Sequence, residues 1–200
     1  STKIAFANTA MEICHRMPGT DVDNVISALF LGRDRIISPS YMSGGMGDGG
    51  GCHPRDNIAL SFLARKLGMS FDWFSNIMLQ RERQTDWLAD LVEEHAEGRP
   101  ICVLGKAFKP SCSIDTGSPA LLLGNILEER GYSVVRYDPH FDSAGAAPTD
   151  KAYCYFIGTR HPEFRVFPYA PGSVVLDPWR YIEDRPGVKV VRIGVGQPVT

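Results

Sequence analysis

Several features that identify common classes of protein are missing from this sequence of 200 residues. Lysine and arginine total 21 against 23 aspartates and glutamates, and the net charge of −2 excludes bulk electrostatic attraction to nucleic acid or anionic membranes. No apolar segment approaches the roughly 20 residues that a membrane-spanning helix needs, and the amino terminus lacks a signal-peptide pattern. The sequence therefore predicts no nucleic-acid partner and no membrane partner.

The cysteines are widely scattered along the chain. The five cysteines are odd in number and form no C-x-x-C pair, so neither a disulfide framework nor a zinc site is indicated, and no metal ligand is predicted. They are Cys14, Cys52, Cys102, Cys112 and Cys154. This usage fits a reducing cytoplasm, and the composition, with 44% apolar and 22% charged residues, is that of an ordinary globular protein.

The G-x-G-x-x-G fingerprint of NAD-binding Rossmann domains is also absent from the strand-rich second half of the chain. Gly194 and Gly196 form a G-V-G sequence, but it follows a predicted strand and opens no helix. The sequence is therefore compatible with nucleotide binding, but not in the manner of an NAD-binding Rossmann half.

The most informative stretch is glycine-rich, GGMGDGGGCHPRD over residues 44–56. Glycine lets the backbone approach a ligand closely, and Pro54 is typical of the first turn of a helix. Cys52 would then lie at a helix N-terminus, which stabilises negative charge and favours a thiolate. Asp56 follows one helical turn later, so its carboxylate could face the same ligand. The alternative is a plain linker followed by a small buried cysteine.

Apolar residues at helical spacing predict helices in the first half of the chain. They cover residues 2–16, a short segment from Asp21, residues 54–67, and a long segment capped by Ser70 that reaches His95. The first helix is apolar on so much of its circumference that we expect it to be buried, in a core or in a subunit interface. We predict a homodimer formed through this helix.

The pattern changes at residue 98. Short apolar runs then alternate with a helix over 118–130 and with loops; the runs are 101–104, 133–137, 153–157, 174–176 and 188–193. This alternation predicts an α/β fold with a parallel, doubly wound sheet, whose ligands bind at the carboxyl ends of the strands. We therefore expect a helical domain over 1–97 and an α/β domain over 98–200.

Six stretches resemble the UDP-glucose and GDP-mannose dehydrogenase family, and they follow one another along nearly the whole chain as in that family. Residues 47–56 match its G-x-G-G-x-C-x-x-[KR]-D motif, and residues 104–110, LGKAFKP, match its L-G-x-A-F-K-P loop. The other four are D-R-I at 34–36, Y-D-P at 137–139, T-R-H-P-E-F at 159–164 and D-P-W-R at 177–180. The resemblance implies a helical central dimerisation region followed by a Rossmann-like nucleotide-sugar-binding domain.

The resemblance also implies an activity. Members of the family oxidise C6 of a sugar nucleotide twice, using two NAD⁺, so that a primary alcohol becomes a carboxylate. Cys52 would attack the intermediate aldehyde to give a thiohemiacetal and then a thioester. Asp56 would assist proton movement and hydrolysis of the thioester by water.

Substrate contacts are implied at further positions. Lys109 matches the lysine of the F-K-P loop, Arg35 an arginine that reaches the partner subunit's site, and Arg180 an arginine near the uracil ring. Tyr41, Gly47, Gly49 and Gly50 complete the predicted substrate-binding set.

Some family features are not found in this sequence. The N-terminal NAD domain is missing, and the family's catalytic lysine and asparagine should precede residue 1. The T-R-E-S sequence that many members carry after the F-K-P loop is also absent, which leaves the sugar and the base open. We expect a fragment of a UDP-sugar dehydrogenase, inactive alone, acting on UDP-glucose or a UDP-N-acetyl-hexosamine. The alternatives are a GDP-mannose dehydrogenase, a non-catalytic sugar-nucleotide-binding remnant, and an interaction module built on the first helix.

Overall fold

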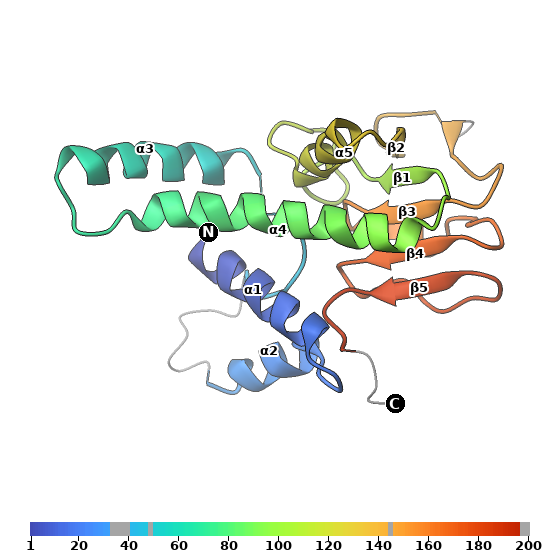
Figure 1. The fold of residues 1–200 in the computed structure, drawn as a ribbon, viewed down its shortest axis with the longest axis horizontal. Coiled ribbons are helices and arrows are strands. Elements are labelled where there is room, and N and C mark those ends of the chain that lie inside the picture. The colour runs from blue at the N-terminus through green and yellow to red at the C-terminus, as the bar shows by residue number, and fades with distance from the viewer. Residues whose placement is uncertain (33–40, 48–49, 144–145, 197–200) are drawn as a thin grey trace.

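The computed structural model describes residues 1–32, 41–47, 50–143 and 146–196 (Figure 1). Four helices come first: α1 (Thr2–Arg16), α2 (Val22–Phe30), α3 (Cys52–Lys66) and α4 (Trp73–Ala96). A sheet follows, with strands β1 (Ile101–Leu104), β2 (Val134–Tyr137), β3 (Cys154–Ile157), β4 (Val174–Asp177) and β5 (Lys189–Arg192). Helix α5 (Pro119–Glu129) lies between β1 and β2, and a short 3₁₀ helix, η2 (Pro162–Arg165), follows β3. None of the described helices is long and apolar enough to cross a membrane.

Capping side chains set two of the helix starts. The Asp21 carboxylate accepts the N–H of Asp23 at 2.8 Å and begins α2, as the sequence predicts. The predicted cap of α4 at Ser70 is wrong, because the carboxylate of Asp72 accepts the N–H of Ser75 at 2.9 Å and the helix begins two residues later. Helix α3 begins at Cys52 itself, earlier than the predicted start at Pro54.

All five strands are parallel, in the order β2-β1-β3-β4-β5. The chain builds outward from β1 to β2 on one side, and then continues on the other side of β1 with β3, β4 and β5. The direction of winding therefore reverses between β1 and β3, which is where open parallel sheets bind their ligands.

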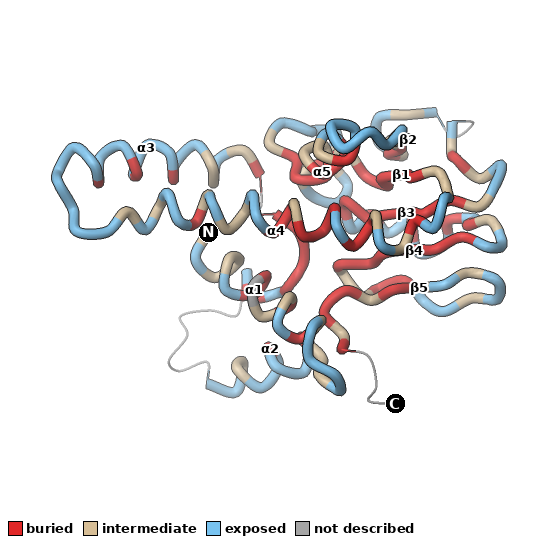
Figure 2. Tube along the Cα trace, viewed as in Figure 1, coloured by how far each residue is buried: buried red, intermediate tan, exposed pale blue. Residues whose placement is uncertain are grey.

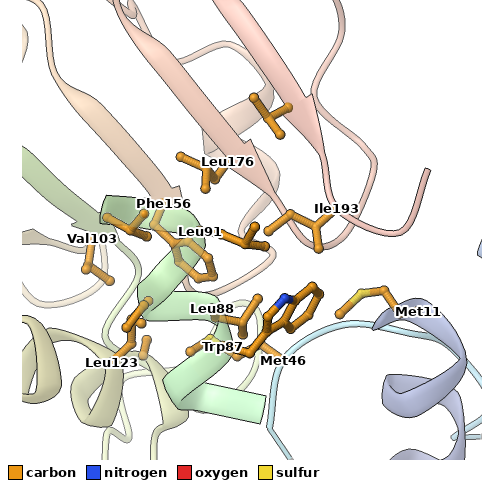
Figure 3. Packing of buried hydrophobic residues seen from close by; sticks show 14 of the residues in the cluster. Met11, Met46, Trp87, Leu88, Leu91, Val103, Leu123, Phe156, Leu176 and Ile193 are labelled. Atoms are coloured by element: carbon orange, nitrogen blue, oxygen red, sulfur yellow. The ribbon is translucent and has the colours of Figure 1, made fainter. Parts of the chain in front are cut away.

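One face of the sheet is covered by α4 and α5. Leu88 and Leu91 of α4 and Leu123 of α5 pack with Phe156 and Leu176 of the sheet in one buried cluster (Figure 3). The same cluster includes Met11 of α1 and Met46 of the glycine-rich stretch. The hydrophobic core therefore joins the sheet, the first helix and the segment that leads to Cys52.

The other face of the sheet is covered differently from a doubly wound fold. Its buried cluster consists largely of aromatic side chains from strands and loops, among them Tyr155, Phe164, Phe167, Tyr169 and Tyr181. In the described chain the long helices α4 and α5 share one face, and only η2 and loops lie on the other. Large aromatic rings make this possible, since each of them buries 150–250 Å² without needing a helix to carry it.

Helices α3 and α4 form a hairpin that extends beyond the sheet (Figures 1 and 2). The second half of α4 lies in the core, whereas α3 and the start of α4 are largely exposed in Figure 2. The division at residue 97 stays a prediction, and the core cluster contains residues from both sides of it.

Candidate functional site

The glycine-rich stretch packs against the carboxyl ends of the strands. A Cβ atom on Gly45 would overlap the ring of Trp179, which follows β4. Gly50 has a positive φ of 111°, and a Cβ there would lie 2.6 Å from the ring of Phe108. Only glycine permits this approach at both positions. The stretch that precedes Cys52 is thus in direct contact with the F-K-P loop, although 48–49 lie outside the described residues.

Two buried amide side chains hold this stretch from the helical side. Asn8 of α1 donates to the carbonyl of Gly47 at 3.0 Å and accepts the N–H of Gly45 at 3.2 Å. Gln84 of α4 donates to the carbonyl of Gly45 at 2.8 Å and accepts a second hydrogen bond from Asn8 at 3.1 Å. Neither Asn8 nor Gln84 was identified from the sequence. The signal that could have identified them is a polar amide side chain at a helical position that the apolar pattern predicts to be buried.

Cys52 is exposed and is the first residue of α3. Asp56 lies four residues later on the same helix, and its carboxylate forms an exposed ion pair with Arg55 at 2.9 Å. The next residue after the cysteine, His53, meets the start of α1, where Nδ1 lies 3.0 Å from the hydroxyl of Ser1. The two helix N-termini therefore come together beside the thiol.

A buried carboxylate positions the loop that carries Lys109. Asp138 accepts the N–H groups of Lys106 at 2.6 Å and Ala107 at 3.1 Å, and also bonds to His161 Nε2 at 3.1 Å. Burial acts to raise the pKa of Asp138, but the hydrogen bonds from His161 and the backbone outweigh it and hold that pKa well below its usual range. The carboxylate is therefore ionised when the loop is in place.

His161 completes this support from the other side. Its Nδ1 accepts the N–H of Ser111 at 3.2 Å, so the ring proton must lie on Nε2, from which it is donated to Asp138. The imidazole is fully buried. The Asp138–His161 pair thus holds the loop on both sides of Lys109.

A cavity of about 250 Å³ lies at the carboxyl ends of β1, β3 and β4, and we name it the cationic compartment. It is lined by Ser43, Met46, Phe108, Lys109, Pro110, Pro119, Gly158, Thr159, Arg160 and Trp179. A second cavity of about 180 Å³, the neutral compartment, is lined by Ile4, Asn8, Tyr41, Ser43, Gly45, Met46, Gly47, Phe108 and Trp179. The shared residues Ser43, Met46, Phe108 and Trp179 make the two compartments adjacent.

The predicted substrate-binding residues do not all line one cavity. Lys109 lines the cationic compartment, Tyr41 and Gly47 line the neutral one, and Gly50 packs behind Phe108. Arg35 and Gly49 lie outside the described residues. Neither Cys52 nor Asp56 is among the described residues that line the compartments, so a sugar that reaches the thiol must extend past the glycine-rich stretch.

Arg180 is engaged within the protein. Its guanidinium binds both carboxylate oxygens of Asp23, at 2.7 and 2.9 Å, and donates to the carbonyl of Gly44 at 2.9 Å. The remaining N–H groups face the carbonyls of Pro178 and Ile193, at 2.5 and 3.1 Å. All five N–H groups therefore have protein acceptors, and the side chain is only 5% exposed. This geometry gives the predicted contact with the substrate no support and makes Arg180 a link between α2, the glycine-rich stretch and the sheet.

Three potential metal ligands also meet in the described chain: His140, His161 and Glu163. His140 Nε2 lies 3.3 Å from a Glu163 oxygen. Nε2 of His161 already donates to Asp138, and its Nδ1 accepts a hydrogen bond, so the ring has no lone pair free for an ion in this arrangement.

Comparisons with known proteins agree on one group. Residues 1–80 match the sequence profile described as "UDP-glucose/GDP-mannose dehydrogenase family, central domain". The chain is 30% identical over 202 residues to a UDP-glucose 6-dehydrogenase of Bacillus subtilis, a match that covers 100% of the chain and 42% of the relative. It is 33% identical over 141 residues to a UDP-glucose 6-dehydrogenase of Haloferax volcanii, covering 70% of the chain and 32% of the relative.

Comparison of the fold with solved structures identifies the same family. A UDP-glucose dehydrogenase structure from Pyrobaculum islandicum superposes with a TM-score of 0.77 at 27% identity, over 97% of the chain and 48% of that structure. The chain thus spans less than half the length of each of these three proteins.

Proposed function

Because the chain belongs to the UDP-glucose/GDP-mannose dehydrogenase family, we propose that it is part of an NAD-dependent enzyme that oxidises C6 of a UDP-sugar to the carboxylate. The observation that carries this proposal is the contact between Gly50 and the ring of Phe108. It brings the segment leading to a nucleophile, Cys52, against the loop that presents a cation, Lys109. An oxidised sugar carbon and a nucleotide phosphate require those two groups.

The role proposed for Cys52 is nucleophilic catalysis through a covalent intermediate. Its thiolate sulfur forms a bond to the aldehyde carbon at C6, and the former carbonyl oxygen takes up a proton. NAD⁺ would supply the two-electron oxidation that such an adduct needs. The role of Cys52 in this chain is to hold the C6 carbon and to leave as the thiolate when water adds to that carbon. Asp56, one helical turn away, accepts the proton of that water. The result is a carboxylate and a regenerated thiolate.

The residues of this chain do not fit the NAD⁺ that such an oxidation needs. The G-x-G-x-x-G spacing occurs once in the sequence, at residues 45–50, but no described strand precedes it. Gly194 and Gly196 follow β5 without opening a helix in the described chain. We therefore assign no residue here to the cofactor, and we propose that these 200 residues bind the sugar nucleotide without turnover.

The proposal is tested by protection of the thiol. We expect UDP-glucose to slow alkylation of Cys52, measured by mass spectrometry of iodoacetamide-treated protein, while alkylation of the half-buried Cys112 is unchanged. Stronger protection by GDP-mannose than by UDP-glucose would assign the substrate to the other branch of the family. If saturating sugar nucleotide left alkylation of Cys52 unchanged, the proposed role of the thiol would be wrong.

We also propose a homodimer that includes α1. One face of α1 is core, through Ala7 and Met11, but Phe6 and Ile13 on other faces are 50% and 52% exposed. Beside Phe6 lies an apolar hollow of about 360 Å³ that is also lined by Trp73. The hairpin of α3 and α4 adds further exposed apolar side chains: Ile58, Leu60, Phe62, Leu63, Leu67, Met69, Phe71 and Leu79. A patch of this extent is typical of a subunit interface.

A further inference from the structure

We propose that Arg160 is a second diphosphate-binding cation of the sugar-nucleotide site, acting with Lys109 across the cationic compartment. The proposal rests on the proposed function, because it takes the ligand to be a nucleotide sugar. It assigns a residue that the sequence motifs left without a role, and it makes Arg160 a determinant of affinity for the charged part of the ligand.

The topology places the two cations together. Lys109 follows β1 and Arg160 follows β3, and these strands are hydrogen-bonded neighbours in the sheet. The winding direction reverses between them, so the loops after the two strands diverge and leave a crevice at their carboxyl ends. Both side chains line the cavity found at that position.

The charge of the cavity is unbalanced. Lys109 and Arg160 are the two charged side chains among its described lining residues, and no acidic side chain accompanies them. Elsewhere in the same domain cations are neutralised: Lys106 binds Asp142 at 2.7 Å and Arg136 binds Glu128 at 2.6 Å. A concave site with two uncompensated cations attracts a polyanion.

The contacts of the two cations are aromatic rather than ionic within the described chain. The ammonium of Lys109 lies 5.4 Å from the centre of the Phe108 ring, and the guanidinium carbon of Arg160 lies 5.5 Å from the centre of the Tyr181 ring. Such stacking orients a cation and leaves its N–H groups available. A guanidinium then offers paired donors that match phosphate oxygens, and the lysine adds a point charge.

Uncharged hydrogen-bond donors lie beside the cationic compartment, at the N-terminus of α5. Helix α5, of 11 residues, begins at Pro119, which lines the cavity. Ser118 before it does not cap the helix, and its hydroxyl is buried without a hydrogen-bond partner in the described structure. The first N–H groups of the helix have no acceptors within the helix. Phosphate oxygens in the compartment would supply acceptors to this end of α5.

The size of the cavity favours the diphosphate over the whole ligand. About 250 Å³ is smaller than the pockets of roughly 300–1,000 Å³ that hold complete drug-sized ligands. The neutral compartment adjoins it and has no charged lining residue in the described chain. An uncharged portion of the ligand would extend there, along the glycine-rich stretch that leads to Cys52.

The test is calorimetric titration of the 200-residue protein with UDP and with uridine, which share a base but not the phosphates. We expect Arg160→Ala to weaken binding of UDP by roughly 10- to 100-fold, the effect of losing hydrogen bonds to a charged group, and to leave uridine binding unchanged. Arg160→Lys keeps the charge and should give an intermediate loss. Arg165→Ala is the matched control, because Arg165 also lies on the Tyr181 ring, at 5.6 Å, but does not line the cavity.

Each other outcome has a definite meaning. If Arg160→Ala and Arg160→Lys both bind UDP as tightly as the native protein while Lys109→Ala binds it weakly, the role of Arg160 is wrong and the proposed function stands. Equal losses for UDP and uridine would make Arg160 a packing residue on Tyr181, which also overturns the inference. If the native protein binds neither UDP nor GDP, both the inference and the proposed sugar-nucleotide function fail.

Discussion

The carboxylate of Asp138 and the imidazole of His161 meet at 3.1 Å, and both side chains are completely buried. They come from the loops after β2 and β3, and together they bind the backbone of the loop that carries Lys109 on either side of it. The position of that lysine therefore depends on two residues that no ligand needs to touch.

Removing the Asp138 carboxylate should unfold this arrangement. We expect Asp138→Ala to lower the free energy of unfolding by roughly 3–5 kcal/mol. The N–H groups of Lys106 and Ala107 and the imidazole of His161 would then be left without their charged acceptor. Urea denaturation followed by circular dichroism measures the loss. Asp142→Ala is the control, because its carboxylate is partly exposed and pairs with Lys106, and it should cost less. Equal losses for the two variants would contradict the central role of Asp138.

The same carboxylate predicts a dependence of stability on pH. The pKa of Asp138 is lower in the folded protein than in the unfolded chain, so the folded state binds fewer protons. Its stabilisation is complete above the unfolded pKa of about 4 and is lost progressively as the pH falls below that value. Urea midpoints of the native protein should therefore decrease below about pH 4 more steeply than those of Asp138→Asn. Parallel pH profiles for the two proteins would disagree with this assignment.

The amide pair of Asn8 and Gln84 predicts a cost when either member is truncated. Asn8→Ala leaves the N–H of Gly45 and the carbonyl of Gly47 buried without these partners, and we expect a loss of about 1–3 kcal/mol in stability. Asn76→Ala, at an exposed position in the first half of α4, should change the free energy of unfolding by about 0.5 kcal/mol or less. A thermal-unfolding comparison of the two variants decides whether the amides matter.

Substitutions of Arg180 can show whether this side chain stabilises the fold or binds the ligand. Arg180→Lys cannot reproduce the fork that binds both oxygens of Asp23 and the carbonyl of Gly44, so stability should fall nearly as far as in Arg180→Ala. Asp23→Ala should cost less, because that carboxylate is 55% exposed. Full rescue of stability by lysine, with lost affinity for UDP, would instead indicate the ligand contact that the family resemblance implies.

Thiol reactivity should differ sharply among the cysteines. Burial raises the pKa of Cys102 above its ordinary value and raises that of Cys154 to about 12, and both side chains are inaccessible. Cys52 is exposed at the start of α3. We expect iodoacetamide to label Cys52 at least tenfold faster than either buried thiol in native protein. Comparable rates in 6 M urea would confirm that folding causes the difference, and comparable rates in native buffer would refute it.

The proposed dimer predicts a specific response to charge. Sedimentation of the native protein at micromolar concentration should show a dimer, and Phe6→Glu should shift it toward monomer, because a charge would be buried in the interface. Val166→Glu is the control, since that side chain is 82% exposed and lies outside α1 and the α3–α4 hairpin. A monomeric native protein would contradict the proposal.

The sequence predicts the bounds of an element well where residues within the element or next to it determine where it begins and ends. The run 101–104 is apolar at every position and ends at Gly105, and β1 has these bounds. Ser118, Pro119 and Gly131 bracket α5 within a residue of its predicted limits. The start of α4 was placed wrongly because Ser70 and Asp72 are both good caps, and only the geometry of the preceding turn selects the aspartate.

The site was less predictable because its contacts are distant in sequence. The motifs identify the glycine-rich stretch and Lys109, but Asn8 and Gln84 are 76 residues apart and neither belongs to a motif. Arg180 matches a motif, yet its hydrogen bonds reach Asp23 and Gly44, more than 130 positions away. Such pairings follow from the packing of α1, α2 and α4 on the sheet. The cytoplasmic location expected from the cysteines stays a prediction.

Helix α4 distributes local stability unevenly along its 24 residues. Nine of its residues are buried, and only Ile77 precedes Gln84. Opening of the second half would disrupt the core of the sheet, whereas the first half is held mainly by α3. We therefore expect backbone amides near Trp73 to exchange with solvent through small local openings, and those near Leu88 to exchange only when the whole molecule unfolds. Helix α3, which carries the Cys52 thiol, packs on the end of α4 that opens more easily. Segments that move when a ligand binds commonly lie in such regions of low local stability.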